Sequence, residues 1–572
     1  MRRPDRVTQA VVAVSVLALL ARLVGLGARP LHWDEARVGY WTLRSLAVGT
    51  YEYRPVAGGP FLYVVGRWLF SLFGPGDAVA RLPVAIVGGL LPLVALLFRF
   101  DGKPSEPEAP SAGLDAAETV SLSVLLGFAP PLLYYSRVLR GDLPLAAFAL
   151  VTVGLLYRAH TRENRPALYA GAAALGLTLT TSGFALALLG CWVAALVLVF
   201  DEGRVRGDPP GVLLARVRRV GRKLWSSTTP VLRAVLVTIA VALFFYIPRG
   251  VVDLTRPSTW LSALSSGSVG ALNRFLAVRV LGRHAPPEHL NDHALLPFVA
   301  DNAGVLLATA LPVVALGLWG FLRERYGGRS RAVVSFGASW AGVGLLVFPM
   351  ATEVNEPWVA VHVLVPMTLP AAVGLAALWG ATRAALADGR AARVATALLL
   401  VSATGLHTGV VVADEVYDAP APADDLPGYA QPDTELGPAT TVVEAAIAGN
   451  DGVDVLFVGE RFAVADESVL DRPPIPPNAR DAFSERLPFA WYVERLDAET
   501  ASVSSPDDAP ETLPPVVVTA PRYTPALSDR VAAYDRYEVD LALTDRAVVV
   551  PFEAFWNDGL LTATRQDTNV TA

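Results

Sequence analysis

Lysine is scarce in this 572-residue sequence, and cysteine is almost absent. Only two of the 47 basic residues are lysines, Lys103 and Lys223, and neither is followed by Ser or Thr. A Walker-A phosphate loop needs Gly-Lys followed by Ser or Thr, so a P-loop ATP-driven pump is excluded. The single cysteine, Cys191, rules out an intramolecular disulfide and a cysteine-based zinc site. Its apolar surroundings predict a packed helix position.

Charge is also scarce, at 17% of residues, whereas 53% are hydrophobic and the mean hydropathy is +0.43. This composition is typical of a polytopic membrane protein. Residues 413–572 hold 30 of the 53 Asp and Glu residues but only 10 of the 47 Lys and Arg residues. We therefore expect a membrane region and an acidic exposed region that does not bind nucleic acid. Many Asp and few Lys predict a halophilic source, unless they reflect GC-rich codon usage.

The first 412 residues contain eleven charge-poor apolar stretches of about the length that crosses a bilayer. They are 7–27, 79–98, 119–136, 143–158, 167–182, 184–200, 231–248, 303–321, 332–350, 358–379 and 394–412. The uncharged run 167–200 is too long for one crossing helix, so we place a break at residues 180–183, which are small and polar.

The N-terminal segment and the loops on its side of the membrane contain 22 Arg and Lys residues, whereas the loops on the opposite side contain 12. The positive-inside rule then predicts a multi-pass cell-membrane protein with a cytoplasmic N-terminus and an extracellular C-terminal domain. The first apolar stretch lacks a small-x-small cleavage site, so we interpret it as a retained helix.

The predicted fold class is a polytopic α-helical membrane protein of about eleven spans with a small C-terminal α/β exterior domain. The expected domains are a transmembrane domain over 1–412 with a first exterior loop at 28–77, a linker at 413–440 and the acidic domain at 441–572. Stretches that mix aromatic or Leu residues with Arg predict interfacial helices at 33–49, 61–73 and 269–282. In the acidic domain we expect a helix at 441–448 and strands at 454–458, 515–519 and 546–550.

Acidic and arginine residues occur together in three loops that the topology places on the exterior face. They are Asp34 and Glu35, then Arg137, Arg140 and Asp142, then Glu353 and Glu356, followed by Trp358 and His362. Converging on one surface beside apolar helices, they would form a cleft suited to a lipid-linked anionic substrate. Each residue taken alone is equally well explained as a solvated loop end, a helix cap such as Asp142, or a packed helix end such as Trp358 with His362.

Several motifs carry a family resemblance through most of the chain. An Asp-Glu pair after the first span, the segment 135–145 (YSRVLRGDLPL) opening the fourth span and a C-terminal exterior domain resemble the GT-C superfamily of polyprenyl-phosphate-dependent glycosyltransferases. Protein O-mannosyltransferases and lipid A aminoarabinose transferases belong to this superfamily. More narrowly, residues 31–35 (LHWDE), 356–362 (EPWVAVH) and 488–492 (PFAWY) resemble the archaeal flippase activity-associated family, which is linked by name with N-glycosylation.

The resemblance implies an inverting membrane glycosyltransferase that moves a sugar from a polyprenyl (dolichyl) phosphate to an acceptor at the exterior face, in cell-surface or protein glycosylation. Asp34 would be the general base and Glu35 would orient it. Arg137 and Arg140, and more weakly Arg54, would bind the donor phosphate. Supporting roles would fall to the remaining loop residues, Asp142, Glu353, Glu356, Trp358 and His362.

One departure from the family keeps a second hypothesis open. Relatives tend to carry a Lys-Glu pair near the turn after the fifth span, where this chain has Ser182 and Gly183. Either an arginine has taken over the role of that lysine, or the protein is a non-catalytic accessory in flipping or assembly of lipid-linked oligosaccharide. A secondary transporter is disfavoured, because ionisable residues are not found near mid-membrane.

The remaining predictions concern partners and modification. Membrane lipids, the polyprenyl-phosphate sugar donor and glycosylation-pathway proteins are the expected partners. No cofactor is required; exterior carboxylates also suit a divalent cation, but no fixed ligand spacing supports one. Asn569 begins a glycosylation sequon. The pair Trp491 and Tyr492 is interpreted as core of the acidic domain or as a surface on which a sugar ring stacks.

Overall fold

The structure is a computed structural model, and it describes most of the chain. The described residues are 5–54, 58–100, 113–205, 228–250, 256–270, 272–273, 295–327, 331–352, 356–420, 424–428, 431–432, 436–471, 475–532, 534–539 and 552–557. The chain divides into two compact units. Unit 1 comprises Met1–Val24, Glu52–Leu62 and Leu82–Asp418, and unit 2 comprises Gly25–Tyr51, Tyr63–Arg81 and Ala419–Ala572.

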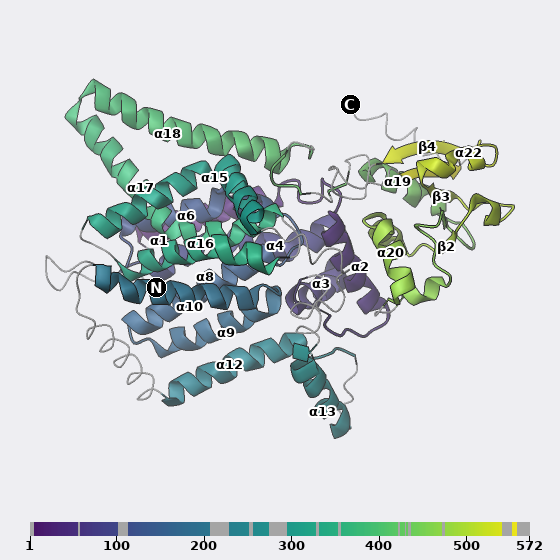
Figure 1. Cartoon of the computed structure of the whole chain (residues 1–572), viewed down its shortest axis with the longest axis horizontal. Coiled ribbons are helices and arrows are strands. Elements are labelled where there is room, and N and C mark those ends of the chain that lie inside the picture. The colour runs from purple at the N-terminus through teal and green to yellow at the C-terminus, as the bar shows by residue number, and fades with distance from the viewer. Residues whose placement is uncertain are drawn as a thin grey trace. The chain divides into compact units, whose positions relative to one another are not determined.

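Unit 1 is built from helices (Figure 1). They are α1 (Arg6–Leu23), most of α4 (Asp77–Leu90), η1 (Leu91–Val94), α5 (Ala95–Phe98), α6 (Ala116–Phe128), α7 (Pro130–Tyr135), α8 (Asp142–Thr161), α9 (Arg165–Thr181), α10 (Ala185–Val205), α12 (Thr228–Tyr246), α13 (Pro257–Ser265), η2 (Ser266–Gly270), α15 (Leu295–Tyr326), α16 (Ala332–Ala351), η5 (Pro357–Val359), α17 (Ala360–Asp388), α18 (Ala391–Val411) and η6 (Val412–Tyr417).

All eleven predicted spans fall on helices. Among the described residues, eight helical segments are long and apolar enough to cross a membrane. They are Arg6–Leu23, Asp77–Phe98, Asp142–Thr161, Thr228–Tyr246, Leu295–Tyr326, Ala332–Ala351, Pro357–Asp388 and Ala391–Tyr417. The other three predicted spans lie on α6, which ends before the prolines at 130 and 131, on α9, which ends at Thr181, and on α10, whose apolar part is Ala185–Val199. The prediction of a polytopic helical membrane protein is confirmed.

Close backbone contact packs α15 against α17. A Cβ added to Gly320 would lie 2.0 Å from the carbonyl oxygen of Pro370, and one added to Gly374 would lie 2.2 Å from that of Leu316. Only glycine permits this approach, so the backbones of the two helices pack close together at these positions. The segment Pro357–Asp388, which contains α17, is the most deeply buried of the candidate spans in the described part of the chain.

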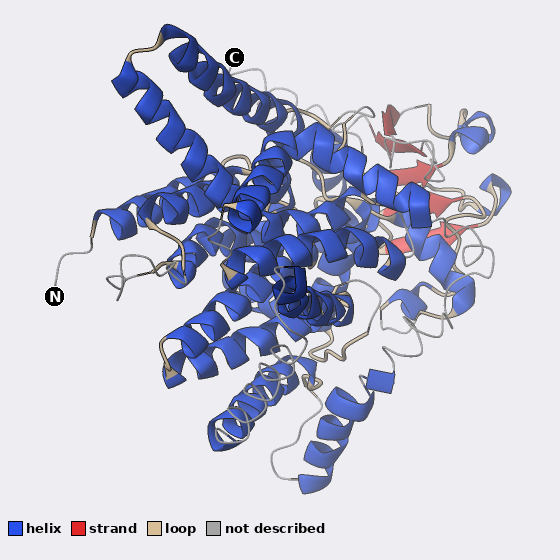
Figure 2. Cartoon of the chain, turned by 60° about the vertical axis from the view of Figure 1, so that its left-hand side comes forward, coloured by secondary structure: helices blue, strands red, loops and turns tan. Residues whose placement is uncertain are grey.

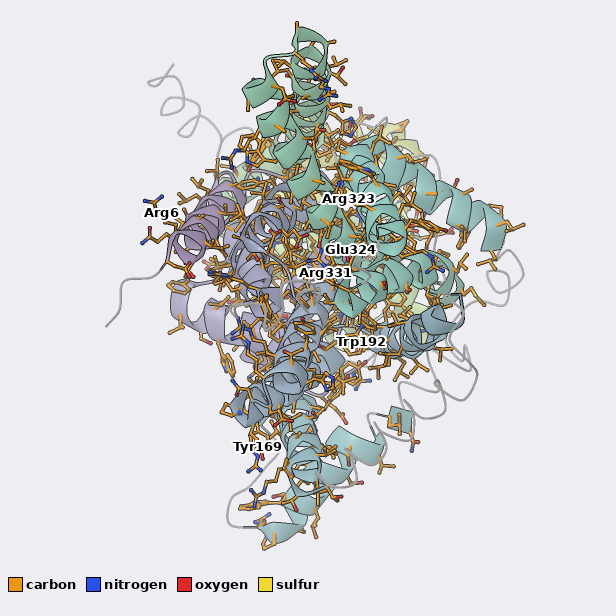
Figure 3. The ribbon with its side chains drawn as sticks, turned by 90° about the vertical axis from the view of Figure 1, so that its left-hand side faces the viewer. Arg6, Tyr169, Trp192, Arg323, Glu324 and Arg331 are labelled. Atoms are coloured by element: carbon orange, nitrogen blue, oxygen red, sulfur yellow. The ribbon has the colours of Figure 1, made fainter. Side chains whose placement is uncertain are left out.

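A buried ionic cluster joins three other helix ends of unit 1. Arg331, which precedes α16, contacts Glu118 of α6 at 2.6 Å and Glu324 of α15 at 2.6 Å. All three side chains are at most 4% exposed, and Figure 3 shows Glu324 and Arg331 next to each other. Burial opposes the charge on Arg331, but hydrogen bonds to both carboxylates raise its pKa above the ordinary value. The cluster therefore ties together helices that are far apart in sequence.

Unit 2 combines helices with one sheet, which contains the strands of the described chain (Figure 2). Its elements are α2 (Trp33–Ala47), most of α3 (Pro60–Phe73), α19 (Leu436–Ile447), β1 (Val455–Val458), η7 (Glu467–Leu470), α20 (Pro477–Arg486), α21 (Phe489–Arg495), β2 (Thr500–Val503), η8 (Pro506–Asp508), β3 (Val516–Thr519), η9 (Pro521–Tyr523), α22 (Thr524–Leu527), β4 (Tyr534–Val539) and β5 (Phe552–Asn557).

The sheet has the strand order β2-β1-β3-β5-β4. Strand β1 pairs in parallel with β2 and β3, Val455 lying opposite Thr500 and Val516, whereas β5 pairs antiparallel with β3 and β4. Both β1 and β3 are buried throughout and, except for Thr519, apolar, as inner strands require. Leu456 and Val458 of β1 and Val517 of β3 form a buried core with Leu527 and Val531.

The structure agrees with several local predictions in unit 2 and extends others. Helices α2 and α3 cover the predicted interfacial stretches 33–49 and 61–73, and α19, β1 and β3 match the predicted helix and two strands. The predicted strand 546–550 and most of the stretch 269–282 lie outside the described residues. The predicted linker begins as π-helix η6 at Val412–Tyr417, which continues α18.

Candidate functional site

The Asp-Glu motif begins helix α2 of unit 2 through a capping box. His32 Nδ1 accepts a hydrogen bond from the backbone N–H of Asp34 at 3.1 Å, and Glu35 Oε2 accepts one from the N–H of His32 at 2.9 Å. These bonds satisfy backbone donors that an isolated helix start leaves unpaired, and the positive end of the helix dipole favours the two carboxylates. The local sequence therefore fixes where both acidic residues stand.

Glu35 is bound to an arginine that the sequence analysis did not identify. Arg81 Nη2 and Nε donate to the Glu35 carboxylate at 2.7 and 2.8 Å, and both side chains are at most 2% exposed. Arg81 also donates to the carbonyl oxygens of Leu26, Arg29 and Pro30. This arrangement lets Glu35 fix the segment before α2, and its predicted role in orienting Asp34 stays a prediction.

Asp34 is more accessible than its neighbour. Its side chain is 16% exposed, and Oδ1 accepts a hydrogen bond from Arg37 Nη2 at 2.7 Å. The guanidinium of Arg37 in turn lies over the Trp33 ring, 4.5 Å from its centroid. A carboxylate held at a helix start by a stacked arginine is a defined group that can accept a proton.

The second set of predicted residues forms a row within unit 1. Arg140 Nε contacts Asp142 Oδ2 at 3.0 Å, and Asp142 Oδ1 lies 3.2 Å from His362 Nε2. The Arg140 guanidinium stacks on the ring of Trp358 at 3.5 Å from its centroid, and His362 stacks on Phe348 at 4.2 Å. Asp142 and Trp358 therefore hold the Arg140 guanidinium directly, and His362 holds Asp142 in turn.

Asp142 does not cap α8, although capping had been one of its two expected roles. Gly141 occupies the N-cap position, and Asp142 is the first residue of the helix, with its carboxylate bound to Arg140 and His362. A Cβ added to Gly141 would lie 2.2 Å from the carbonyl oxygen of Thr181 and 3.4 Å from Cβ of Ser182. The Arg140 hairpin thus packs directly on the turn that departs from the family pattern.

Arg137 is engaged at the end of another helix. Its Nη1 donates to the carbonyl oxygens of Ala21 and Arg22 at 3.1 Å and also to that of Val24, and its guanidinium lies 4.7 Å from the ring centroid of Tyr417. Carbonyls at a helix C-terminus attract a cation. Arg137 therefore caps α1, and its predicted contact with donor phosphate stays a prediction.

The other predicted site residues are placed as follows. Arg54 is half-buried in unit 1, and Glu356 and Trp358, both buried, lie at the start of η5. Glu353 and Asn569 lie outside the described residues. Within the described part of the chain, no group of three or more His, Cys, Asp or Glu residues is arranged to hold a metal ion.

Trp491 and Tyr492 lie in α21, not in a strand, and both are buried. Of the two roles considered, core is confirmed for Trp491, whose side chain is 0% exposed. A buried ring cannot offer its face to a sugar.

The chain is similar to known proteins in the sequence of its C-terminal domain and in the fold of nearly its whole length. Residues 436–553 match the family model described as Agl23 flippase-associated protein C-terminal domain. The crystal structure of ArnT from Cupriavidus metallidurans in the apo state is 15% identical, with a TM-score of 0.58, and covers 96% of this chain and 98% of that chain. The structure of that protein bound to undecaprenyl phosphate is 16% identical, with a TM-score of 0.55 and coverages of 97% and 99%. No curated protein sequence matches the chain.

The structural likeness extends over nearly the whole chain, and at this level of identity it establishes the fold. The family match lies in the C-terminal domain, where the PFAWY motif was found. The chain therefore has the fold of these ArnT structures, and its residues 436–553 match the C-terminal domain of the Agl23 flippase-associated proteins.

Proposed function

We propose that the protein is an inverting glycosyltransferase that moves a sugar from a polyprenyl-phosphate donor to an acceptor. The observation that carries the proposal is the row Arg140, Asp142 and His362, which holds a guanidinium in one orientation beside the turn at Ser182. A planar guanidinium binds phosphate through two parallel hydrogen bonds. The fold similarity to a protein crystallised with undecaprenyl phosphate supports a polyprenyl-phosphate ligand.

In this mechanism Asp34 removes the proton from the acceptor as the acceptor attacks the anomeric carbon. The new bond to the sugar forms while the bond from the anomeric carbon to the phosphate oxygen breaks, and the lipid phosphate leaves with the bonding electron pair. Arg140 stabilises the negative charge that develops on this leaving group. A positioned base contributes about 10²–10⁴ in rate.

Arg140 takes over the role that a lysine plays in relatives. The family's Lys-Glu pair would fall at the turn where this chain has Ser182 and Gly183, and Gly141 packs against that turn. In this proposal an arginine supplied from the adjacent hairpin replaces the missing cation. Arg137 and Arg54 remain secondary candidates for the phosphate.

The donor lipid is of the dolichyl type, and the acceptor belongs to a cell-surface or protein glycosylation pathway of an archaeal, halophilic cell. The N-terminus is cytoplasmic and the C-terminal domain extracellular. Glycosylation-pathway proteins are partners, and the reaction needs no cofactor, with divalent-cation dependence as a separate test.

The alternative is a non-catalytic accessory protein that binds the lipid phosphate for flipping or assembly of oligosaccharide. The absence of the Lys-Glu pair at Ser182 and Gly183 favours it. Purified protein reconstituted in lipid vesicles at high salt would be given radiolabelled sugar on polyprenyl phosphate, alongside Asp34→Asn and Arg140→Gln. Transfer by the wild type that is lost in both variants supports the enzyme. If no sugar is transferred but lipid phosphate binds and Arg140→Gln weakens that binding, the accessory role is the better conclusion.

A further inference from the structure

The C-terminal domain contacts both the start of α4 and the residue that precedes the capping box of α2. Trp491 Nε1 donates to Asp77 Oδ1 at 2.9 Å, and the hydroxyl of Tyr492 donates to Asp77 Oδ2, also at 2.9 Å. The same hydroxyl accepts a hydrogen bond from the backbone N–H of Leu31 at 2.9 Å. Tyr492 therefore connects the C-terminal domain to the residue immediately before the capping box of α2.

The middle of α2 rests on the buried ring of Trp491. A Cβ added to Gly39 would lie 2.9 Å from a ring carbon of Trp491, so this position needs glycine for the helix to approach the ring. Tyr40 donates to the carbonyl oxygen of Leu470 at 3.4 Å, and Arg44 pairs with Glu494 at 2.8 Å. Contacts with the C-terminal domain thus extend along the helix from its start to its last turn.

A third contact leads directly to Asp34. Trp33 Nε1 donates to the carbonyl oxygen of Ser484 at 2.8 Å. The ring fixed by this bond carries the guanidinium of Arg37, which pairs with Asp34 at 2.7 Å. The orientation of the Asp34 carboxylate therefore depends, through two neighbours, on a carbonyl group of the C-terminal domain.

We propose that the C-terminal domain positions the general base: Tyr492, through Leu31, and α20, through Trp33, hold the start of α2 so that Asp34 meets the acceptor. The inference rests on the proposed glycosyl transfer and adds a task for the domain that the family match covers. Tyr492 is a positioning residue and does not touch the substrate. Misplacement of a catalytic group by about 1 Å is enough to cost up to about a hundredfold in rate.

The test uses full-length protein reconstituted in vesicles with a radiolabelled polyprenyl-phosphate sugar. Tyr492→Phe removes one hydroxyl and keeps the ring, and we expect kcat to fall about tenfold while KM for the donor stays unchanged. A matched control is Tyr534→Phe, because the Tyr534 hydroxyl donates to the carbonyl oxygens of Leu513 and Pro514 within the same domain and not to α2. This control is expected to transfer like the wild type.

A double-mutant cycle separates positioning from a loss of folded protein. Asp34→Glu moves the carboxylate by one methylene, so adding Tyr492→Phe to it should lower kcat by clearly less than tenfold. The inference would be overturned if the effects of Asp34→Glu and Tyr492→Phe on kcat were additive. It would also be overturned if Tyr492→Phe kept the kcat of the wild type or lowered kcat only as much as Tyr534→Phe does. If Tyr492→Phe does not reach the membrane, Trp33→Phe removes a different bond to the same helix and carries the same expectation.

Hydrogen exchange distinguishes failure of this inference from failure of the proposed function. Faster amide exchange over residues 33–41 is expected in Tyr492→Phe and not in Tyr534→Phe. If the wild type transfers no sugar, the proposed function fails and the positioning of a base falls with it, while faster exchange still shows that Tyr492 holds α2. Unchanged exchange together with active wild type overturns the positioning inference alone.

Discussion

His362 Nε2 lies 3.2 Å from Asp142 Oδ1, and the other oxygen of this carboxylate accepts from Arg140 Nε at 3.0 Å. The histidine is 0% exposed and the carboxylate 4%, so neither group is oriented by solvent. This pair makes the position of Arg140 a property of the packed helices α8 and α17, and not of a loose loop.

Asp142→Asn is expected to weaken binding of polyprenyl phosphate about tenfold, because an amide cannot replace the charge-assisted bond to Arg140. Binding would be measured by titrating the lipid into the purified protein. Asp388→Asn is the matched control, since Asp388 pairs with Arg393 at an exposed position and its loss should leave affinity unchanged. Equal affinity in Asp142→Asn and wild type would show that Arg140 needs no anchor.

Asp34 and Glu35 are neighbours with different expected phenotypes. Glu35→Gln breaks a buried ion pair with Arg81, so we expect a loss of about 3–5 kcal/mol in stability and reduced membrane abundance. Asp34→Asn alters a partly exposed pair and should change stability by less than about 1 kcal/mol while abolishing transfer. Thermal unfolding in detergent and transfer assays on the two variants check this separation. Normal stability in Glu35→Gln would contradict the structural role of Glu35.

Local patterns were enough to predict the elements that carry the candidate residues. Helix α2 at Trp33–Ala47 was expected from amphipathic spacing over 33–49, and the end of α9 at Thr181 from small polar residues in a long apolar run. Strands β1 and β3 were expected because short apolar runs that are rich in β-branched and aromatic residues are typical of buried strands. These are features that neighbouring residues decide.

Contacts between distant residues could not be predicted in this way. Arg81 binds Glu35 across 46 positions, and no spacing rule links an arginine early in an apolar helix to that carboxylate. Strand β2 at Thr500–Val503 is half-buried and polar enough to pass as a loop. The pair Trp491 and Tyr492 lies in helix α21, where Trp491 bonds to Asp77 and its ring packs on Gly39, both far away in the sequence.

Arg331→Leu is expected to destabilise unit 1 strongly. The change leaves the buried carboxylates of Glu118 and Glu324 without their common partner, and removing one member of a buried ionic cluster costs about 3–5 kcal/mol. The midpoint of thermal unfolding in detergent would be compared with that of Arg393→Leu, which removes an exposed ion pair and should change stability by less than about 1 kcal/mol. Similar midpoints for the two variants would mean that the cluster does not hold the helices together.

The contact between α2 and the C-terminal domain should depend on pH through Glu494. Burial raises the pKa of its carboxyl to about 7, against the attraction of Arg44 and with added repulsion from Asp497 and Asp471. Between the ordinary pKa, near 4.5, and 7, the folded state keeps a proton that the unfolded state loses. The stabilisation from this group is therefore complete below about pH 4.5 and lost as pH rises through 7.

Glu494→Gln removes this dependence, because a glutamine is neutral at every pH. We expect the stability of the variant relative to wild type to increase by about 1–3 kcal/mol between pH 5 and pH 8. Unfolding midpoints of both proteins at the two pH values would measure the difference, with the exposed Glu444→Gln as the control that should follow the wild type. Parallel pH curves for Glu494→Gln and wild type would show that Glu494 is already ionised at pH 5, and that the bond to Arg44 outweighs its burial.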